Sequence, residues 1–190
     1  MAFENSTILP SPLSAHAGRY LLETITASSD ASIDFTTGFD SSIYDRYEID
    51  FDRVVSATDH VSLRYRVSTD GGSTWDSGAS TYGGNAHILT SSPTHLTSAT
   101  NLTSGYLNYL QGTAAGNEAQ GCHGRIEISG LTESVRTSVR CTYRHWDSAG
   151  YAANGISCYT RQADQVENGF QIFYDSGNIA SGTFKLYGIK

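Results

Sequence analysis

The sequence predicts an all-β protein, an antiparallel β-sandwich and, within that class, a jelly roll. Ser and Thr make up roughly a quarter of the chain while Leu, Lys and Glu are scarce, a composition that favours strands and turns over helices. Apolar and polar residues alternate in several short segments, which is the period of a half-buried strand. Turn residues fall between these segments at short spacing and no long segment has a helical period, a pattern typical of sandwiches.

Each predicted strand is an alternating or apolar segment bounded by turn residues. The expected strands are 19–25, 32–35, 44–55, 61–67, 125–131, 134–146, 156–160, 169–174 and 182–189. Turn signals rich in Gly, Asn, Asp and Ser lie at 147–150, 154–155 and 175–178, where such residues supply left-handed conformations or local hydrogen bonds.

The clearest alternation lies in 44–55, which places apolar residues on one side and carboxylates on the other. The apolar side is Tyr47, Ile49 and Phe51, and the carboxylates are Glu48, Asp50 and Asp52. Segment 61–67 alternates in the same way and turns Arg64 and Arg66 outward. We therefore expect the two segments to be neighbouring antiparallel strands with ion pairs across a solvated face. The same solvation argues against an acid–base pair of carboxylates.

A length of 190 residues predicts one domain. Residues 1–18 are polar, carry Pro10 and Pro12 and lack periodicity, so we expect an extended N-terminal arm before a single sandwich domain over 19–190. The arm has no basic segment followed by an apolar one, so no secretory signal is expected. Residues 77–117 carry no charge; ordered pieces are expected at 86–90 and 106–110, and the rest is either shielded by a partner or a solvated loop.

Charge and hydropathy limit the partners. The chain has 12 Lys and Arg against 19 Asp and Glu, a net charge of -7, which disfavours nucleic acid. No apolar run approaches the length of a membrane span. The basic residues are almost all Arg, the side chain best suited to interface ion pairs. We therefore expect protein partners, with no nucleic acid and no membrane.

The three cysteines, Cys122, Cys141 and Cys158, are too few for a disulfide scaffold. Buried free thiols are the expected state, and a bridge between Cys141 and Cys158 is the alternative. A metal site could gather Cys122, His123, Cys141 and His145, but this spacing matches no standard zinc pattern. We expect neither a metal nor a cofactor.

The sharpest local motif is residues 68–75, STDGGSTW, which resembles the Asp-box of sialidases and other β-propeller proteins. Its residues have structural roles in a hairpin: a carboxylate accepts backbone N–H groups, glycines adopt positive φ and the aromatic ring anchors the turn. The residues concerned are Ser68, Asp70, Gly71, Gly72, Thr74 and Trp75. One copy in a chain of this length does not make a propeller, and common hydrolase and nucleotide-binding motifs are absent. We expect no enzymatic activity.

Aromatic residues near turns offer a second kind of function. Tyr82, Trp146 and Tyr151 are candidate glycan contacts, because exposed aromatic rings can stack on sugar rings, and Trp75 lies near a turn as well. In a chain with 12 Tyr most aromatic residues pack in the core or at its rim. A module that binds host-surface glycans is therefore the alternative to a structural role.

The C-terminal segment is similar to the ending of a family of small tailed-bacteriophage proteins. Residues 170–189 read FQIFYDSGNIASGTFKLYGI, and the family ends in F-x-SGNIASGTFxLYGI. Residues 44–49, 63–78 and 124–128 resemble family segments in the same order, and the resemblance covers about 19–190. The shared positions are turns and strands, which specify a fold more directly than an activity.

This resemblance implies a virion component made in the host cytoplasm. The expected function is a non-enzymatic capsid decoration or cement protein, or a head fibre. Such a protein would self-associate, with a trimer favoured, and bind the major capsid protein or a tail protein. The alternative that the resemblance allows is a tail-tip or tail-fibre module that binds host glycans.

Overall fold

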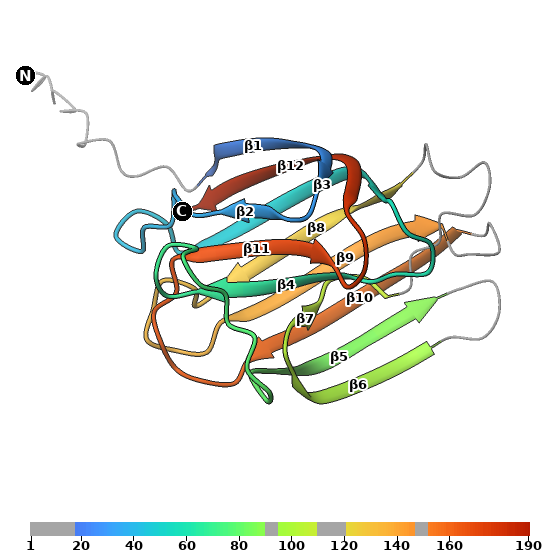
Figure 1. The fold of residues 1–190 in the computed structure, drawn as a ribbon. Coiled ribbons are helices and arrows are strands. Elements are labelled where there is room, and N and C mark those ends of the chain that lie inside the picture. Colours follow the sequence, from blue (N-terminus) through green and yellow to red (C-terminus); the bar gives the residue numbers. More distant parts are fainter. Residues whose placement is uncertain (1–17, 90–94, 110–120, 147–151) are drawn as a thin grey trace, which may run out of the picture.

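The computed structural model describes residues 18–89, 95–109, 121–146 and 152–190. Its regular elements are strands, all paired antiparallel, which confirms the predicted fold class. Figure 1 shows two layers, with the smaller sheet in front of the larger one. Apart from Gly18, the predicted N-terminal arm lies outside the described residues.

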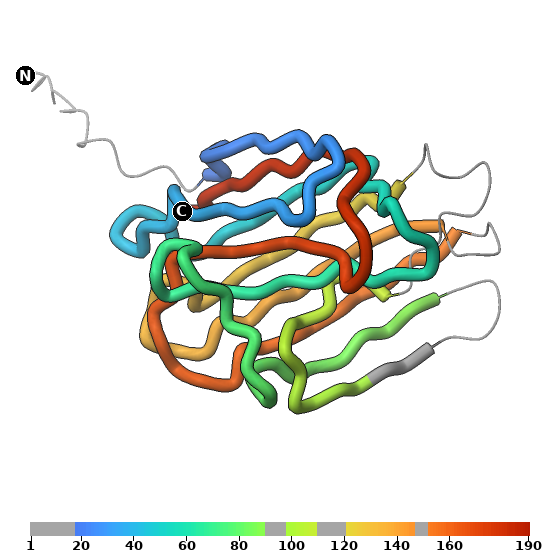
Figure 2. The backbone as a smooth tube through the Cα atoms, viewed as in Figure 1, coloured from blue at the N-terminus to red at the C-terminus, as the bar shows by residue number. Residues whose placement is uncertain are grey.

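The larger sheet has eight strands. Its order is β1 (Arg19–Asp30), β12 (Ile179–Ile189), β3 (Arg46–Ser56), β8 (Cys122–Ser129), β9 (Ser138–Trp146), β10 (Ala152–Arg161), β5 (Tyr82–Leu89) and β6 (His95–Leu102). The smaller sheet has the order β2 (Ile33–Phe35), β11 (Gly169–Tyr174), β4 (Leu63–Ser68) and β7 (Gly105–Tyr106). Figure 2 shows the chain passing repeatedly from one sheet to the other. This order fits a β-sandwich, and the jelly-roll connectivity stays a prediction.

Aromatic side chains fill the space between the sheets. The ring of Tyr65 on β4 stacks on Phe170 of β11 at 5.2 Å and meets Tyr82 of β5 edge-on at 5.5 Å. The Tyr65 hydroxyl donates to the carbonyl of Tyr159 on β10 at 3.1 Å. All four residues are fully or almost fully buried. Aromatic rings bury large apolar areas, and the tyrosine hydroxyls form hydrogen bonds within the core. These rings therefore supply the core of a chain that has few leucines.

The predicted alternation in β3 is correct on its apolar side. Tyr47, Ile49 and Phe51 are all buried between the sheets. On the other side Asp52 is exposed, but Glu48 is only 5% exposed. The prediction that Glu48 is solvated is therefore wrong. Arginines from β1 and β8 cover its carboxylate.

The predicted pairing of 44–55 with 61–67 is wrong. Strand β3 lies between β12 and β8 in the larger sheet, whereas β4 lies between β11 and β7 in the smaller one. The chain crosses between sheets after Ser56, and its next residues bond to the turn after β11: Ala57 N donates to Asn178 O at 2.9 Å. The ion pairs expected across the two strands do not form, and Arg64 pairs with Asp175 at 3.1 Å instead.

The uncharged stretch 77–117 contributes three strands, β5, β6 and β7. Tyr82, Ala86, Ile88 and Leu107 from this stretch are buried, so much of it belongs to the core. Strand β6 was not predicted, because its sequence HLTSATNL lacks an apolar alternation. It is an edge strand held by backbone pairing with β5.

Candidate functional surfaces

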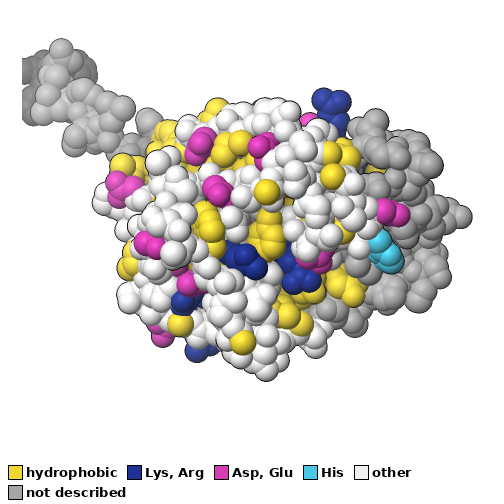
Figure 3. Space-filling view, in the orientation of Figure 1, with side chains coloured by type: hydrophobic (Ala, Val, Ile, Leu, Met, Phe, Trp, Pro, Cys, Tyr) yellow, Lys and Arg dark blue, Asp and Glu magenta, His cyan; other side chains and the backbone are white. Residues whose placement is uncertain are grey.

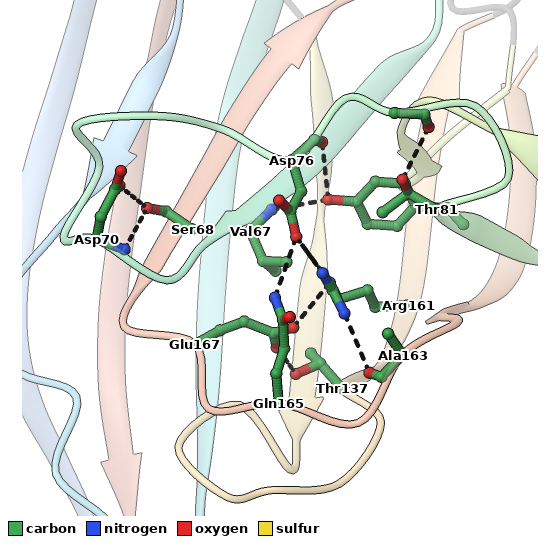
Figure 4. Close-up of polar contacts among 12 residues, drawn as sticks. Val67, Ser68, Asp70, Asp76, Thr81, Thr137, Arg161, Ala163, Gln165 and Glu167 are labelled. Atoms are coloured by element: carbon green, nitrogen blue, oxygen red, sulfur yellow. Dashed lines mark hydrogen bonds and ion pairs between the residues drawn. The ribbon is translucent and has the colours of Figure 1, made fainter.

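The turn at 68–75 has the polar contacts expected of its motif. Asp70 Oδ1 accepts hydrogen bonds from Ser68 Oγ at 2.7 Å and from Thr74 N at 2.8 Å. Asp70 Oδ2 accepts from Thr74 Oγ1 at 2.7 Å. The Ser68 hydroxyl in turn accepts from Gly72 N at 2.9 Å. Figure 4 shows Asp70 turned back onto Ser68 within the loop. The carboxylate therefore closes the turn.

Packing and backbone conformation explain why the motif has a glycine at position 72. Gly72 has a φ of +86°, and a Cβ there would lie 2.5 Å from Thr36 Cγ2, so only glycine fits. The half-buried ring of Trp75 would be 3.2 Å from that Cβ.

The prediction that residues 68–75 form a hairpin is wrong in its topology. Asp76 N donates to Val67 O at 2.9 Å, which closes the turn. The chain then continues to β5 in the other sheet, so the turn connects two sheets rather than two paired strands.

Replacing Asp70 with asparagine should destabilise the protein at neutral pH but not in strong acid. Hydrogen bonds from Thr74 and Ser68 lower the pKa of Asp70 from its ordinary 3.8 to about 2. A lowered folded-state pKa gives stabilisation that is present above about pH 4 and is lost as the pH falls through 2. Urea midpoints of both proteins should therefore differ at pH 7 and converge near pH 2. A difference that stays constant with pH would contradict the role of the charge.

A buried polar network lies beside this turn (Figure 4). Arg161, at the end of β10, places Nη2 2.6 Å from Asp76 Oδ2 and Nε 3.0 Å from Glu167 Oε1. Its Nη1 donates to Ala163 O at 3.2 Å, and Gln165 Nε2 donates to Asp76 Oδ2 at 3.3 Å. The guanidinium thus joins the loop before β5 to the loop before β11.

Glu167 has no exposed surface. Its Oε2 accepts a hydrogen bond from the Thr137 hydroxyl, which brings in a third loop. Burial raises the pKa of Glu167 to about 7, against the opposing effects of the Thr137 hydrogen bond and the Arg161 charge. Sequence reasoning missed this network because Arg161 and Asp76 are 85 residues apart. No local pattern marks the pair.

The outer face of the larger sheet carries a ladder of ion pairs. Arg19 on β1 contacts Glu48 at 2.9 Å and Asp50 at 2.6 Å. Arg125 on β8 contacts the same two carboxylates at 3.6 and 2.9 Å. Burial raises the pKa of Asp50, but hydrogen bonds from Arg19 and Arg125 outweigh it and hold the pKa below its ordinary value. A carboxylate kept ionised in this way is not poised as a general acid.

The cysteines are free thiols among the described residues. Cys122 and Cys141 are buried, as expected, but Cys158 is exposed. A Cys141–Cys158 bridge does not form: Cys141 faces Ser157 across the β9–β10 pair, and the next residue, Cys158, points to the opposite side of the sheet. Within the described ranges, no group of three or more His, Cys, Asp or Glu is placed to hold a metal ion.

The three predicted glycan contacts, Tyr82, Trp146 and Tyr151, differ in how the structure places them. Tyr82 is fully buried, and its hydroxyl bonds to Val67 N at 3.0 Å and Asp76 O at 3.2 Å, so its prediction as a sugar contact is wrong. Trp146 is half-buried at the end of β9, with the Arg144 guanidinium 5.8 Å from its ring centroid. Tyr151 lies outside the described residues.

The outer face of the smaller sheet combines rings with arginines. Arg64 lies over the Tyr106 ring at 4.0 Å, and Arg66 lies over the Phe173 ring at 4.6 Å. Figure 3 shows this face, with basic and hydrophobic side chains side by side near its centre. Arg64 also bonds to Asp175 and to the Tyr106 hydroxyl. These contacts hold the arginines against the sheet.

Comparisons with protein-family models, with curated proteins and with solved structures found no match. In the described part of the chain, no helix is long and apolar enough to cross a membrane.

Proposed function

We propose that this chain is a non-enzymatic structural protein of a tailed-bacteriophage virion. It is a capsid decoration or cement protein, or a head fibre, that self-associates about a three-fold axis and binds the major capsid protein or a tail protein. The proposal starts from the resemblance of residues 170–189 and the three upstream segments to small phage proteins. The positions of those residues and one edge of the larger sheet support it.

The residues that carry the resemblance act in the framework of the fold. Asp175, in the turn between β11 and β12, accepts from Ser62 N at 3.0 Å and pairs with Arg64 at 3.1 Å. Asn178 Nδ2 donates to Ser29 O at 2.8 Å. Strand β12 then lies between β1 and β3. This turn links the two sheets, so a likeness in these positions supports a likeness in fold.

The observation that carries self-association is the edge formed by β1. This strand is 12 residues long, and among the described residues it pairs with β12 alone. Near its start Tyr20 is 41% and Leu21 56% exposed, and Ile43 beside this end is 43% exposed. The Tyr20 ring lies 6.1 Å from the ring of Tyr44. An open edge with apolar side chains favours association with another chain.

Cryo-electron microscopy of the intact phage that encodes the chain tests its place in the particle. Density for the sandwich at capsid three-fold or quasi-three-fold positions, with residues 1–17 on the major capsid protein, is the expected result. Density at the tail alone would favour a tail-tip or tail-fibre module. Absence of the chain from purified virions, checked by mass spectrometry, would overturn the proposal.

Replacing Leu21 with aspartate should weaken self-association by roughly tenfold or more, because a buried leucine contributes about 1.5–3 kcal/mol. Light scattering after size exclusion should show an oligomer for the natural chain and a shift towards the 20.5 kDa monomer for the variant. Deleting residues 1–17 should also shift the oligomer towards the monomer, because the proposed role of the arm is to contact neighbouring subunits.

Val166→Asp is the matched control, because Val166 is 52% exposed but lies in the loop before β11. It should leave the oligomer intact. A natural chain that is monomeric at all concentrations would contradict self-association. An equal shift with Val166→Asp would show that the β1 edge is not the contact.

A further inference from the structure

The outer face of the larger sheet carries a row of four shallow, open hollows. The four hollows, with volumes of 290 to 620 Å³, share lining residues with their neighbours. Glu127 and Arg140 line two of them, Asp50 lines the next pair, and Asp52 and Thr183 line the last pair. The row crosses β9, β8, β3, β12 and β1, which are adjacent strands. Five strands span about 20 Å. We call this feature the outer groove.

The lining of the outer groove has a net positive charge, whereas the chain as a whole has a net negative charge. Its lining contains five cationic side chains and three carboxylates, although the whole chain has a net charge of -7. The cations are Arg46, Arg53, Arg125, Arg140 and Lys185, and the carboxylates are Asp50, Asp52 and Glu127. A local positive excess on an acidic protein attracts anionic ligands.

One end of the outer groove offers donors that a ligand can use. Arg46, Ser129, Ser138 and Arg140 line a single hollow with Glu127. Arg140 lies 3.4 Å from Glu127, and both side chains are well exposed, so solvent screening leaves this pair weak. Among the described residues Arg46 makes no ion pair within 4 Å. Two guanidinium groups and two hydroxyls can together hold a carboxylate.

The cations and carboxylates that line the outer groove favour some classes of ligand over others. Three carboxylates within the outer groove would repel a phosphate at every repeat, which disfavours nucleic acid. The lining contains two aromatic side chains: Phe51 is buried, and the Arg19 guanidinium lies over the Tyr187 ring at 3.4 Å. Neither ring is therefore placed as the central apolar anchor that protein interfaces use. Sugar hydroxyls donate to carboxylates, and sugar carboxylates accept from arginines. A polymer rich in hydroxyls with spaced carboxylates therefore fits both kinds of lining group.

We propose that the outer groove binds an acidic polysaccharide, one whose repeats carry carboxylates. This inference goes beyond the structural role and does not depend on the place of the chain in a particle. The glycan-binding surface is then the outer groove, on the open face of β9, β8, β3, β12 and β1, rather than the aromatic residues of the turns.

Affinity electrophoresis of the full chain in gels containing polygalacturonate, alginate or hyaluronate tests the proposal. The natural chain should be retarded by at least one of these polymers and not by neutral dextran or by polyadenylate. Arg140→Ala should weaken that binding by about tenfold, the loss expected for one charge-assisted contact. Arg46→Ala should weaken it as well.

Arg136→Ala is the matched control, because it makes the same change in net charge at a residue that does not line any of the four hollows. The Arg136 side chain is 56% exposed and lies 3.5 Å from Asp164, almost as the 55% exposed Arg140 lies from Glu127. It should bind like the natural chain. Three results would overturn the proposal: no retardation by any acidic polysaccharide, equal retardation by dextran or polyadenylate, or equal weakening by Arg136→Ala. Cryo-electron microscopy of virions decides the structural role separately.

Discussion

Replacing Arg161 with alanine should lower the free energy of unfolding by about 3–5 kcal/mol. The guanidinium is 9% exposed and neutralises Asp76 at 2.6 Å and Glu167 at 3.0 Å. Without it, one fully buried carboxylate and one half-buried carboxylate face each other with no cation between them. Urea denaturation at pH 8, where Glu167 is ionised, measures the loss.

Arg136→Ala serves as the control for Arg161→Ala, because the Arg136–Asp164 pair is largely exposed. Exposed pairs contribute about 0–1 kcal/mol, so this variant should unfold almost like the natural protein. The double variant Arg161→Met with Glu167→Gln should recover part of the stability, because no charge is then left buried without a partner at Glu167. A loss below about 1 kcal/mol for Arg161→Ala would show that the network does not hold the three loops together.

The sequence was enough to predict the fold class and most strands, because both depend on local patterns. Tyr47, Ile49 and Phe51 alternate with polar residues and are buried as predicted. Which strands pair was not predictable in the same way. Strands β3 and β4 follow each other in the chain and have similar patterns, yet they lie in different sheets. The pattern of a strand records which side is buried and not which neighbour it has.

The polar sites show the same division between local and long-range information. All contacts of Asp70 with Ser68 and Thr74 lie within five residues, so the motif predicted them. Glu48 was expected to be solvated, but its cover comes from Arg19 and Arg125, which are remote in the sequence. The outer groove was also missed, because it forms only when five strands are assembled side by side.

The natural protein should become more stable as the pH falls from 8 towards 5, by an amount on the order of 2 kcal/mol from Glu167 alone. Burial raises the pKa of Glu167 to about 7 in the folded chain, from an ordinary value of 4.5. Between these values the folded state binds the proton and the unfolded state does not, so raising the pH favours unfolding. Below about pH 4 the trend should reverse, because the pKa of Asp70 is lowered to about 2.

Glu167→Gln isolates this contribution, since every other titratable group is the same in both proteins. The amide cannot ionise and its oxygen can still accept the hydrogen bond from Thr137, so the difference in stability between the two proteins should change with pH. The variant should gain relative to the natural protein as the pH rises from 5 to 8, when measured by urea unfolding. A difference that does not vary between pH 5 and pH 8 would mean that Glu167 keeps the same protonation state throughout. The buried carboxylate would then be fully compensated by Arg161 and Thr137, and the network would be insensitive to pH in this range.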